Sequence, residues 1–193
     1  MRIGVLGGSF NPPHVGHLIL ASDACEALGL DKLLIVPAAA NPLKGENAEG
    51  ASPDDRLRMA RESFAGDPRF EVTAMEIDRG GLSYTVDTLE AVAVEYPGAE
   101  LVLLVGMDAF RSLDRWKNPE RIRELASLAV LARGDEASAL PPGVQAVTTR
   151  RIDVSSTEIR TRLAEGRSIK GFVAESVERF ISAAKLYVSP APR

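Results

Sequence analysis

The two histidines of the chain lie together in a stretch that reads GGSFNPPHVGH, at residues 7–17. Because proline cannot lie inside a helix, Pro12 and Pro13 predict a helix that begins just after them. His14 and His17 are three residues apart, so their side chains would share one face near the helix N-terminus. Imidazoles at such a position can donate hydrogen bonds to phosphoryl oxygens, which the positive end of the helix also attracts.

Two other interpretations of the histidine pair are a zinc site and two ordinary surface residues. Zinc needs further nitrogen, sulfur or carboxylate ligands, but the chain has no third histidine, a single cysteine and no acidic residue close to the pair. Gly7 and Gly8 precede the pair and follow an apolar run, so their amides could approach an anion closely. A ligand-free turn would also explain the two glycines alone. Together, glycines and histidines favour a phosphate site that is neither a GK[ST] loop nor a GxGxxG loop.

A second candidate phosphate site lies near the other end of the chain, in the sequence VSSTEIR at residues 154–160. Ser155 and Glu158 have the spacing of a capping box, so a well-capped helix is one interpretation. The hydroxyls of Ser156 and Thr157, the free amides of the first turn and the Arg160 guanidinium would also suit an anion.

Composition limits the class of protein. The chain has 193 residues, 45% of them hydrophobic and 26% charged, which predicts one globular domain with a sizeable core. The net charge of −4 argues against broad nucleic-acid binding. No apolar run reaches membrane-spanning length, and the N-terminus lacks the pattern of a signal peptide. The single cysteine, Cys25, predicts inert packing and a reducing cytoplasm.

Strand-like and helix-like segments alternate along the chain. Strands are expected at 2–6, 33–37, 70–77, 100–106, 128–131 and 144–147, and helices at 16–28, from Ser52 onward, at 84–96 and across 155–187. The alternation indicates an α/β fold: a doubly wound, Rossmann-like parallel sheet with helices on both faces and a helical C-terminal part. Ligands of such sheets bind beyond the carboxyl ends of the strands, where the first motif lies.

The first motif resembles the GxFxPxHxGH signature of the nucleotidyltransferase superfamily, and the second resembles its ISSTxIR motif. These enzymes transfer a nucleotidyl group and release pyrophosphate. Class I aminoacyl-tRNA synthetases have a related HIGH motif, but this chain is too short and too acidic for one. The resemblance implies a single nucleotidyltransferase domain over residues 1–188, in which the helical part 155–188 carries the second motif, followed by a frayed tail at 189–193.

Three further stretches are similar to bacterial nicotinate-mononucleotide adenylyltransferases. GLSYTVDTL at 81–89 resembles their PSYTxxTL segment, with Leu82 in place of proline, and residues 106–116 match their GxDxxxxxxxW segment. NPLK at 41–44 takes the place of their PPHK loop, where Leu43 departs from the pattern and Lys44 remains as the cation. Phosphopantetheine adenylyltransferases share the two phosphate motifs but are shorter and lack the SYT and tryptophan segments.

The resemblance implies transfer of AMP from ATP to nicotinate mononucleotide, which gives nicotinate adenine dinucleotide and pyrophosphate in NAD biosynthesis. The expected catalytic residues are His17, His14, Lys44 and Arg160. The expected ATP-binding residues are Gly7, Gly8, Ser9, Phe10, His14, His17, Gly106, Asp108, Ser155, Ser156, Thr157 and Arg160. The expected nicotinate mononucleotide-binding residues are Ser9, Lys44, Tyr84, Thr85, Trp116 and Arg133. Mg²⁺ is expected on the ATP phosphates, with no protein ligand assigned.

Several of these residues also have a plainer interpretation. Trp116, the only tryptophan, could stack on a pyridine ring or simply pack against its neighbours. Thr85 could bind the nicotinate carboxylate or cap a helix, Asp108 could bind adenosine or cap a helix, and Arg133 could face the cleft or the solvent.

The alternative functions are transfer to nicotinamide mononucleotide or phosphopantetheine, non-catalytic nucleotide binding, and dinucleotide-dependent oxidation. An oxidoreductase would need an acidic residue at the end of the second strand, where Val36 and Pro37 stand. The expected partners are the two small-molecule substrates, without nucleic acid or membrane, and a homo-oligomer is left open.

Overall fold

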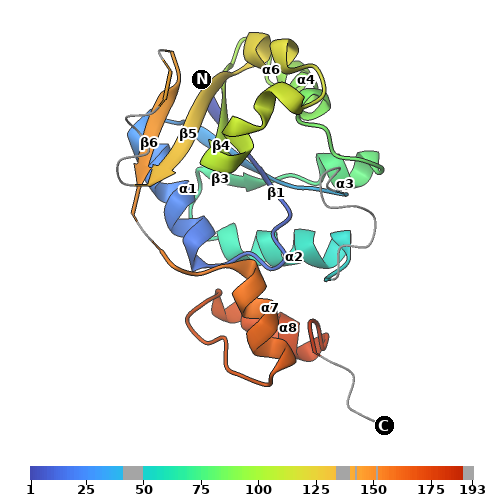
Figure 1. The fold of residues 1–193 in the computed structure, drawn as a ribbon. Coiled ribbons are helices and arrows are strands. Elements are labelled where there is room, and N and C mark those ends of the chain that lie inside the picture. Colours follow the sequence, from blue (N-terminus) through green and yellow to red (C-terminus); the bar gives the residue numbers. More distant parts are fainter. Residues whose placement is uncertain (41–49, 134–139, 142, 151, 189–193) are drawn as a thin grey trace.

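The computed structural model describes residues 1–40, 50–133, 140–141, 143–150 and 152–188, and the side chains of Arg133 and Thr149 are excluded from the description. Within these residues one parallel sheet has six strands in the order β3-β2-β1-β4-β5-β6 (Figure 1). The strands are β1 (Arg2–Gly8), β2 (Lys32–Pro37), β3 (Phe70–Val72), β4 (Glu100–Gly106), β5 (Ser127–Arg133) and β6 (Gln145–Thr149). The expected α/β fold with a doubly wound sheet is confirmed.

Helices connect the first five strands and cover both faces of the sheet. They are α1 (Val15–Leu28), α2 (Pro53–Phe64), α3 (Met75–Arg79), α4 (Thr85–Glu95), α5 (Met107–Arg111), α6 (Pro119–Leu125), α7 (Ser156–Ala164) and α8 (Glu175–Ala183), with a 3₁₀ turn at Leu113–Arg115. α1 ends at Gly29, whose φ of 59° lies in the left-handed region that glycine adopts without steric cost. α2 begins at Ser52, whose hydroxyl accepts a hydrogen bond from the amide of Asp55. None of the described helices is long and apolar enough to cross a membrane.

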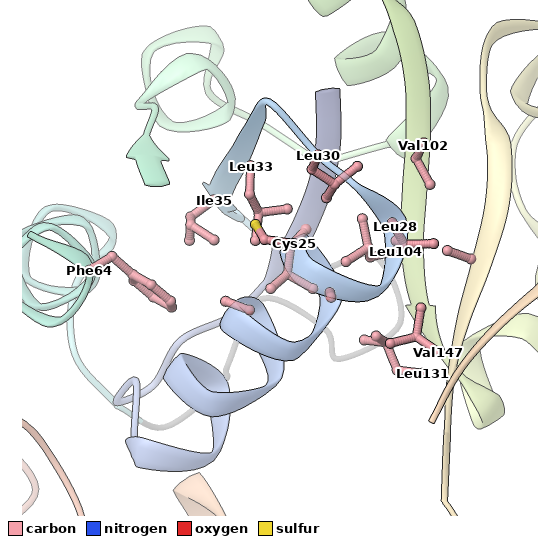
Figure 2. Packing of buried hydrophobic residues seen from close by; sticks show 14 of the residues in the cluster. Cys25, Leu28, Leu30, Leu33, Ile35, Phe64, Val102, Leu104, Leu131 and Val147 are labelled. Atoms are coloured by element: carbon pink, nitrogen blue, oxygen red, sulfur yellow. The ribbon is translucent and has the colours of Figure 1, made fainter. Parts of the chain in front are cut away.

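Apolar side chains pack against each face of the sheet. On one face, residues of α1 and α2 pack onto the strands; this cluster includes Cys25, Leu28, Leu33, Phe64 and Leu104 (Figure 2). On the other face, α4 and α6 supply residues such as Leu89 and Ile122. Strands buried on both faces by helices are what continuous apolar runs such as LVLLV predict.

The order of the strands reverses between β1 and β4. β1 pairs with β2 on one side and with β4 on the other, so the chain leaves the carboxyl ends of β1 and β4 toward opposite faces. The turn after β1 leads to α1, and the turn after β4 leads directly into α5. This arrangement leaves a crevice beyond the carboxyl ends of β1 and β4. The first motif follows β1 there, and the segment that begins at Gly106 follows β4.

α7 and α8 lie below the sheet and pack with α2 around a third apolar cluster (Figure 1). Ile159 of α7 and Val177 of α8 are fully buried there, together with Met59 of α2. This packing fixes the second motif, at the start of α7, against the turn that follows β1.

The structure differs from the expected elements in two places. Residues 70–77 were expected to be extended, but only β3 is, because Thr73 accepts a hydrogen bond from the amide of Met75 and α3 begins there. The short helices α5 and α6 were not expected. The helices expected across 155–187 are present as α7 and α8. The tail at 189–193 lies outside the described residues.

Candidate active site

Two cavities lie at the carboxyl ends of the central strands, and Gly106 and Ala109 line both of them. We call the first the histidine cavity; it has a volume of about 550 Å³ and is lined by His14, Gly16, His17, Ile19, Leu20, Asp23, Gly106, Met107, Asp108, Ala109, Leu131, Arg150, Ile152, Val154, Ser155 and Ser156. We call the second the tryptophan cavity; it has a volume of about 400 Å³ and is lined by residues of β1, β4, α4 and the segment that contains Trp116. The two therefore meet at the reversal of strand order.

The two histidines lie in contact at the start of α1. His14 is the N-cap residue, and its backbone N–H donates to Nδ1 of His17 at 3.2 Å. Their ring centroids are 3.8 Å apart. Because Nδ1 of His17 is an acceptor, a neutral His17 carries its proton on Nε2, which is then free to donate. The expectation that the pair shares one face at a helix N-terminus is confirmed.

Both imidazoles are neutral at physiological pH. Burial lowers the pKa of His14 to about 4. Burial, with the neighbouring His14 as a smaller cause, lowers the pKa of His17 to about 3. Removal of water disfavours the charged form of a base, which explains the direction of both changes. At pH 7 the pair therefore provides N–H donors without a formal charge, at the positive end of α1.

Gly16 allows the two rings to lie where they do. A Cβ atom at this position would lie 2.9 Å from Nδ1 of His14, so any side chain would displace that ring. Nδ1 of His14 is buried and has no hydrogen-bond partner among the described residues.

The second motif contacts the first through side chain to backbone hydrogen bonds. Ser156 donates its hydroxyl to the carbonyl of Pro12 at 2.8 Å, and Arg160 donates to the carbonyl of Asn11 at 2.8 Å. Arg160 also donates to Oγ1 of Thr157 at 3.3 Å. Ser155 caps α7 by accepting from the amide of Glu158 at 3.1 Å. Two segments at opposite ends of the chain thus form one wall.

The tryptophan cavity is lined by the start of α4 and an aromatic ring. Thr85 is the first residue of α4, after Tyr84 as N-cap, so the N-terminus of this helix faces the cavity. Trp116 is partly buried against the apolar cluster of the same face and donates Nε1–H to Oγ of Ser112 at 3.3 Å. Its ring therefore packs against its neighbours, and it also lines the cavity, where a pyridine ring could stack on it.

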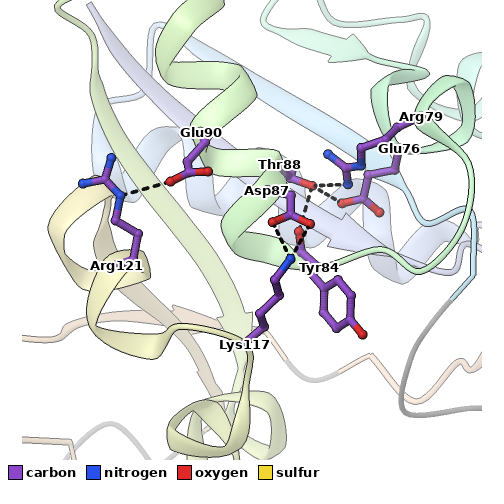
Figure 3. A network of polar contacts seen from close by, with 8 residues as sticks. All are labelled: Glu76, Arg79, Tyr84, Asp87, Thr88, Glu90, Lys117 and Arg121. Carbon is purple, nitrogen blue, oxygen red and sulfur yellow. Dashed lines mark hydrogen bonds and ion pairs between the residues drawn. The ribbon is translucent and has the colours of Figure 1, made fainter.

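A network of polar contacts surrounds the start of α4 (Figure 3). Lys117 lies 2.9 Å from a carboxylate oxygen of Asp87, and its ammonium lies 4.6 Å from the centroid of the Tyr84 ring. The buried carboxylate of Glu76 accepts the hydroxyl proton of Thr88. These contacts fix Tyr84 and the first turn of α4 from two sides.

The structure divides the predicted residues between the two cavities. Of the expected ATP-binding residues, His14, His17, Gly106, Asp108, Ser155 and Ser156 line the histidine cavity. Gly7 and Gly8 line the tryptophan cavity instead, with Tyr84, Thr85 and Trp116. Asp108 has a fully exposed carboxylate, 3.9 Å from Arg111.

Four expected ATP-binding residues, Ser9, Phe10, Thr157 and Arg160, line neither cavity, and three further residues lie wholly or partly outside the description. The Phe10 side chain is 2% exposed and lies in the core, edge-on to His17 at 5.1 Å between centroids, so only its backbone could contact a ligand. Lys44 and Leu43 fall outside the described residues, as does the side chain of Arg133, although its backbone ends β5.

Sequence reasoning did not select several residues that line the cavities. Arg150 lines the histidine cavity and forms an ion pair with Asp23 at 2.8 Å. The two consecutive arginines at 150–151, shortly after a predicted strand, could have pointed to it. Arg115 and Lys117 line the tryptophan cavity and lie in the segment that was noted for Trp116 alone. Glu76 lies in the stretch that was expected to be a strand, so no pattern pointed to it.

Comparisons with known proteins agree with this geometry. The family model of cytidylyltransferase-like proteins matches residues 5–162. A Gemmatimonas aurantiaca protein named "Probable nicotinate-nucleotide adenylyltransferase" is 48% identical over 197 aligned residues, covering 97% of this chain and 92% of that protein. A Thermus thermophilus protein of the same name is 44% identical, covering 97% of this chain and 100% of that protein. A Plasmodium falciparum nicotinic acid mononucleotide adenylyltransferase, solved with NaAD, has the same fold, with a TM-score of 0.77 at 15% identity over 96% of this chain and 97% of that one.

Proposed function

The chain belongs to the cytidylyltransferase-like family and, within it, to the nicotinate-nucleotide adenylyltransferases, and on that premise we propose how its two cavities divide the reaction. The enzyme transfers AMP from ATP to nicotinate mononucleotide and releases pyrophosphate, with nicotinate adenine dinucleotide as the other product. ATP binds in the histidine cavity, and nicotinate mononucleotide binds in the tryptophan cavity.

The observation that carries the proposal is that two chemically different cavities meet at one point. The histidine cavity offers the uncharged N–H donors of the imidazoles and the backbone amides of the first turn of α7, beside Ser155 and Ser156, which suit phosphates. The tryptophan cavity offers an aromatic face and the N-terminus of α4, which suit a pyridine ring with a carboxylate. A reaction that joins two nucleotides needs both kinds of cavity. The reacting phosphates would meet where the two cavities adjoin, beside Gly106.

His17 takes the role of donor to the α-phosphate in the transition state. The phosphate of nicotinate mononucleotide is already anionic at neutral pH, so the attack on the α-phosphorus requires alignment rather than a general base. His17 lines the cavity, and because its Nδ1 accepts from the His14 amide, the proton of the neutral ring lies on Nε2 and can be donated to the phosphate. His14 and Ser156 hold the outer phosphates. Arg160 is the nearby cation for pyrophosphate, and it also fixes the wall through Asn11.

Recognition of the nicotinate ring rests on Trp116 and Thr85. The indole is held by Ser112 and can stack on the ring, while the amide and hydroxyl of Thr85 meet the carboxylate. Tyr84 and Lys117 complete this wall, and Lys117 adds positive potential that favours the acid over the amide. Lys44, Ser9 and Arg133 remain proposed contacts of the substrate phosphate.

Mg²⁺ enters this proposal as a companion of the ATP phosphates. Among the described residues there is no group of three or more histidine, cysteine or carboxylate side chains that could hold a metal ion. The donors that face the histidine cavity are mostly N–H and hydroxyl groups, which fit phosphates better than a hard cation. The phosphate oxygens would therefore hold the ion, which neutralises charge on the leaving pyrophosphate.

The experiment that tests the proposed function is a pyrophosphate-release assay with ATP and Mg²⁺ and three acceptors in parallel. We expect turnover with nicotinate mononucleotide and much weaker turnover with nicotinamide mononucleotide or phosphopantetheine. Equal turnover with the two pyridine nucleotides would contradict the role given to Thr85 and Lys117. Turnover with phosphopantetheine alone would overturn the assignment of the acceptor.

A further inference from the structure

Arg56, in the first turns of α2, is a buried cation that the proposed chemistry leaves without a role. The residue is 6% exposed, and among the described residues no carboxylate contacts its guanidinium. Nη1 donates to the backbone carbonyl of Ser9 at 2.8 Å, and Nη2 donates to the backbone carbonyl of Ala39 at 3.0 Å. Burial lowers the pKa of Arg56, but a guanidinium stays protonated at neutral pH in any protein site.

The two carbonyls belong to two different walls of the site. Ser9 lies in the turn after β1, between the glycines and the histidine pair. Ala39 follows β2, and its N–H donates to Oγ of Ser83 at 2.9 Å, while the Ser83 N–H donates to the Ala40 carbonyl at 2.9 Å. Ser83 in turn lines the tryptophan cavity next to Tyr84. One guanidinium therefore connects the turn of the first motif to the segment that recognises the pyridine nucleotide.

The contact with Ser9 also determines how a strained peptide is oriented. Phe10 has a φ of 45°, which is a costly conformation for a bulky side chain and persists only where surrounding contacts impose it. In a trans peptide the C=O and N–H groups point in opposite directions. Because Arg56 binds the Ser9 carbonyl, the Phe10 N–H must point away from Arg56 and from α2.

Two amides of this turn are unpaired among the described residues. Neither the Ser9 N–H nor the Phe10 N–H has an acceptor among the described residues. Buried or half-buried backbone N–H groups are almost always paired, so two adjacent unpaired ones indicate a position for an anion. They lie directly before the histidines of the motif, on the turn that the guanidinium holds.

We propose that Arg56 is a positioning residue for AMP transfer: its forked contact with the Ser9 and Ala39 carbonyls aims the Ser9 and Phe10 amides at the reacting phosphates. The inference rests on the proposed function, because it assumes that phosphates bind beside the histidine pair. Lysine would keep the charge but lacks the planar fork that bridges two carbonyls, so charge and geometry can be separated.

The test compares Arg56→Lys with Arg61→Lys, a matched substitution on an exposed face of the same helix. We expect Arg56→Lys to lower kcat by about a hundredfold, as expected for misplaced reacting groups, with a smaller change in the KM for nicotinate mononucleotide. We expect Arg61→Lys to match the wild type. Assays run far below the melting temperature of each variant separate positioning from stability. Wild-type kcat in a folded Arg56→Lys variant would overturn the proposal.

A second measurement needs no active enzyme. Inorganic pyrophosphate, added to ¹⁵N-labelled wild-type protein, should move the amide proton resonances of Ser9 and Phe10 downfield. Arg56→Lys should bind pyrophosphate without these two shifts. If the wild type bound pyrophosphate and neither resonance moved, the proposal would be wrong. Should the wild type lack turnover with nicotinate mononucleotide, the proposed function fails, yet the two amide shifts still decide the role of Arg56.

Discussion

The histidine cavity and the tryptophan cavity adjoin each other, but they are built from opposite kinds of interaction. The first contains two imidazoles that lie in contact and are kept neutral by burial, together with backbone amides at the start of a helix. The second holds its groups by partly exposed ion pairs around Tyr84 and by one aromatic ring. Charge develops on the phosphates at the first, so its donors must be in place beforehand. The second cavity only binds and orients a substrate whose charge does not change there, so weaker contacts are sufficient for its task.

Replacement of His17 should have the largest effect, because it removes a preorganised donor at the reacting phosphate. We expect His17→Asn to lower kcat by about a hundredfold or more, in line with the loss of one donor to a transition state. Asparagine can still accept at the position of Nδ1, so the start of α1 should stay intact. His17→Gln places an amide near the position of Nε2 and should recover part of the rate. Equal rates for the Asn variant and the wild type would contradict the role of Nε2.

The stability of the ligand-free protein should fall in mild acid because of the same desolvation. The pKa values of His14 and His17 are about 4 and about 3 in the folded state, below the usual value for histidine. The unfolded state therefore takes up protons first as the pH drops below about 6.5, and it gains stability relative to the folded state. We expect each histidine to contribute a loss on the order of 2 kcal/mol between pH 7 and pH 5.

Urea denaturation at the two pH values measures this loss. His17→Asn should lose about half as much stability as the wild type over the same pH range, since one titrating group is absent. An identical pH dependence in the two proteins would show that His17 has the same pKa in the folded and unfolded states, which would contradict the lowered pKa. The tryptophan cavity contains no histidine, so the effect belongs to one cavity only.

Loss of the Trp116 ring should weaken binding of the acceptor more than it slows the reaction. We expect Trp116→Ala to cost about 1 kcal/mol of stacking, or roughly a fivefold rise in the KM for nicotinate mononucleotide. The KM for ATP should change little, and Trp116→Phe should stay close to the wild type. Steady-state kinetics with each substrate varied in turn provides the comparison. A larger change for ATP would place the wrong substrate in this cavity.

The ion pair of Lys117 should give the smallest effect, because both of its side chains are partly exposed. We expect Lys117→Met to lower the unfolding free energy by less than about 1 kcal/mol and to raise the KM for nicotinate mononucleotide by a few-fold. Arg121→Met is the matched control: Arg121 pairs with Glu90 in the same network but does not line the cavity (Figure 3). Equal KM values for the two variants would assign Lys117 a purely structural role.

The histidine cavity was more predictable from sequence than the tryptophan cavity. Prolines and glycine have strict backbone consequences, so the start of α1 and the shared face of His14 and His17 follow from residue types alone. The strands were predictable for a similar reason, because apolar runs such as 100–106 fit a sheet buried on both faces.

The remaining features depend on contacts between distant segments. The buried guanidinium of Arg56 donates to carbonyls of residues that lie 47 and 17 positions away in the sequence. No local sequence pattern predicts that this arginine is buried. Glu76 became part of α3 because its carboxylate binds Thr88 of the next helix, against the alternation that indicated a strand. Phe10 was expected to bind ATP; its ring fills the core below the turn, so any contact with ATP would come from its backbone.

The division of the two substrates between the two cavities can be measured directly, because the chain contains a single tryptophan. The fluorescence of Trp116 should be quenched when nicotinate mononucleotide is titrated into the protein, since the pyridine ring would stack on the indole. It should be quenched equally in His17→Asn, and ATP alone should leave it almost unchanged in both proteins. Quenching by ATP, together with no response to nicotinate mononucleotide, would contradict the assignment of the two cavities.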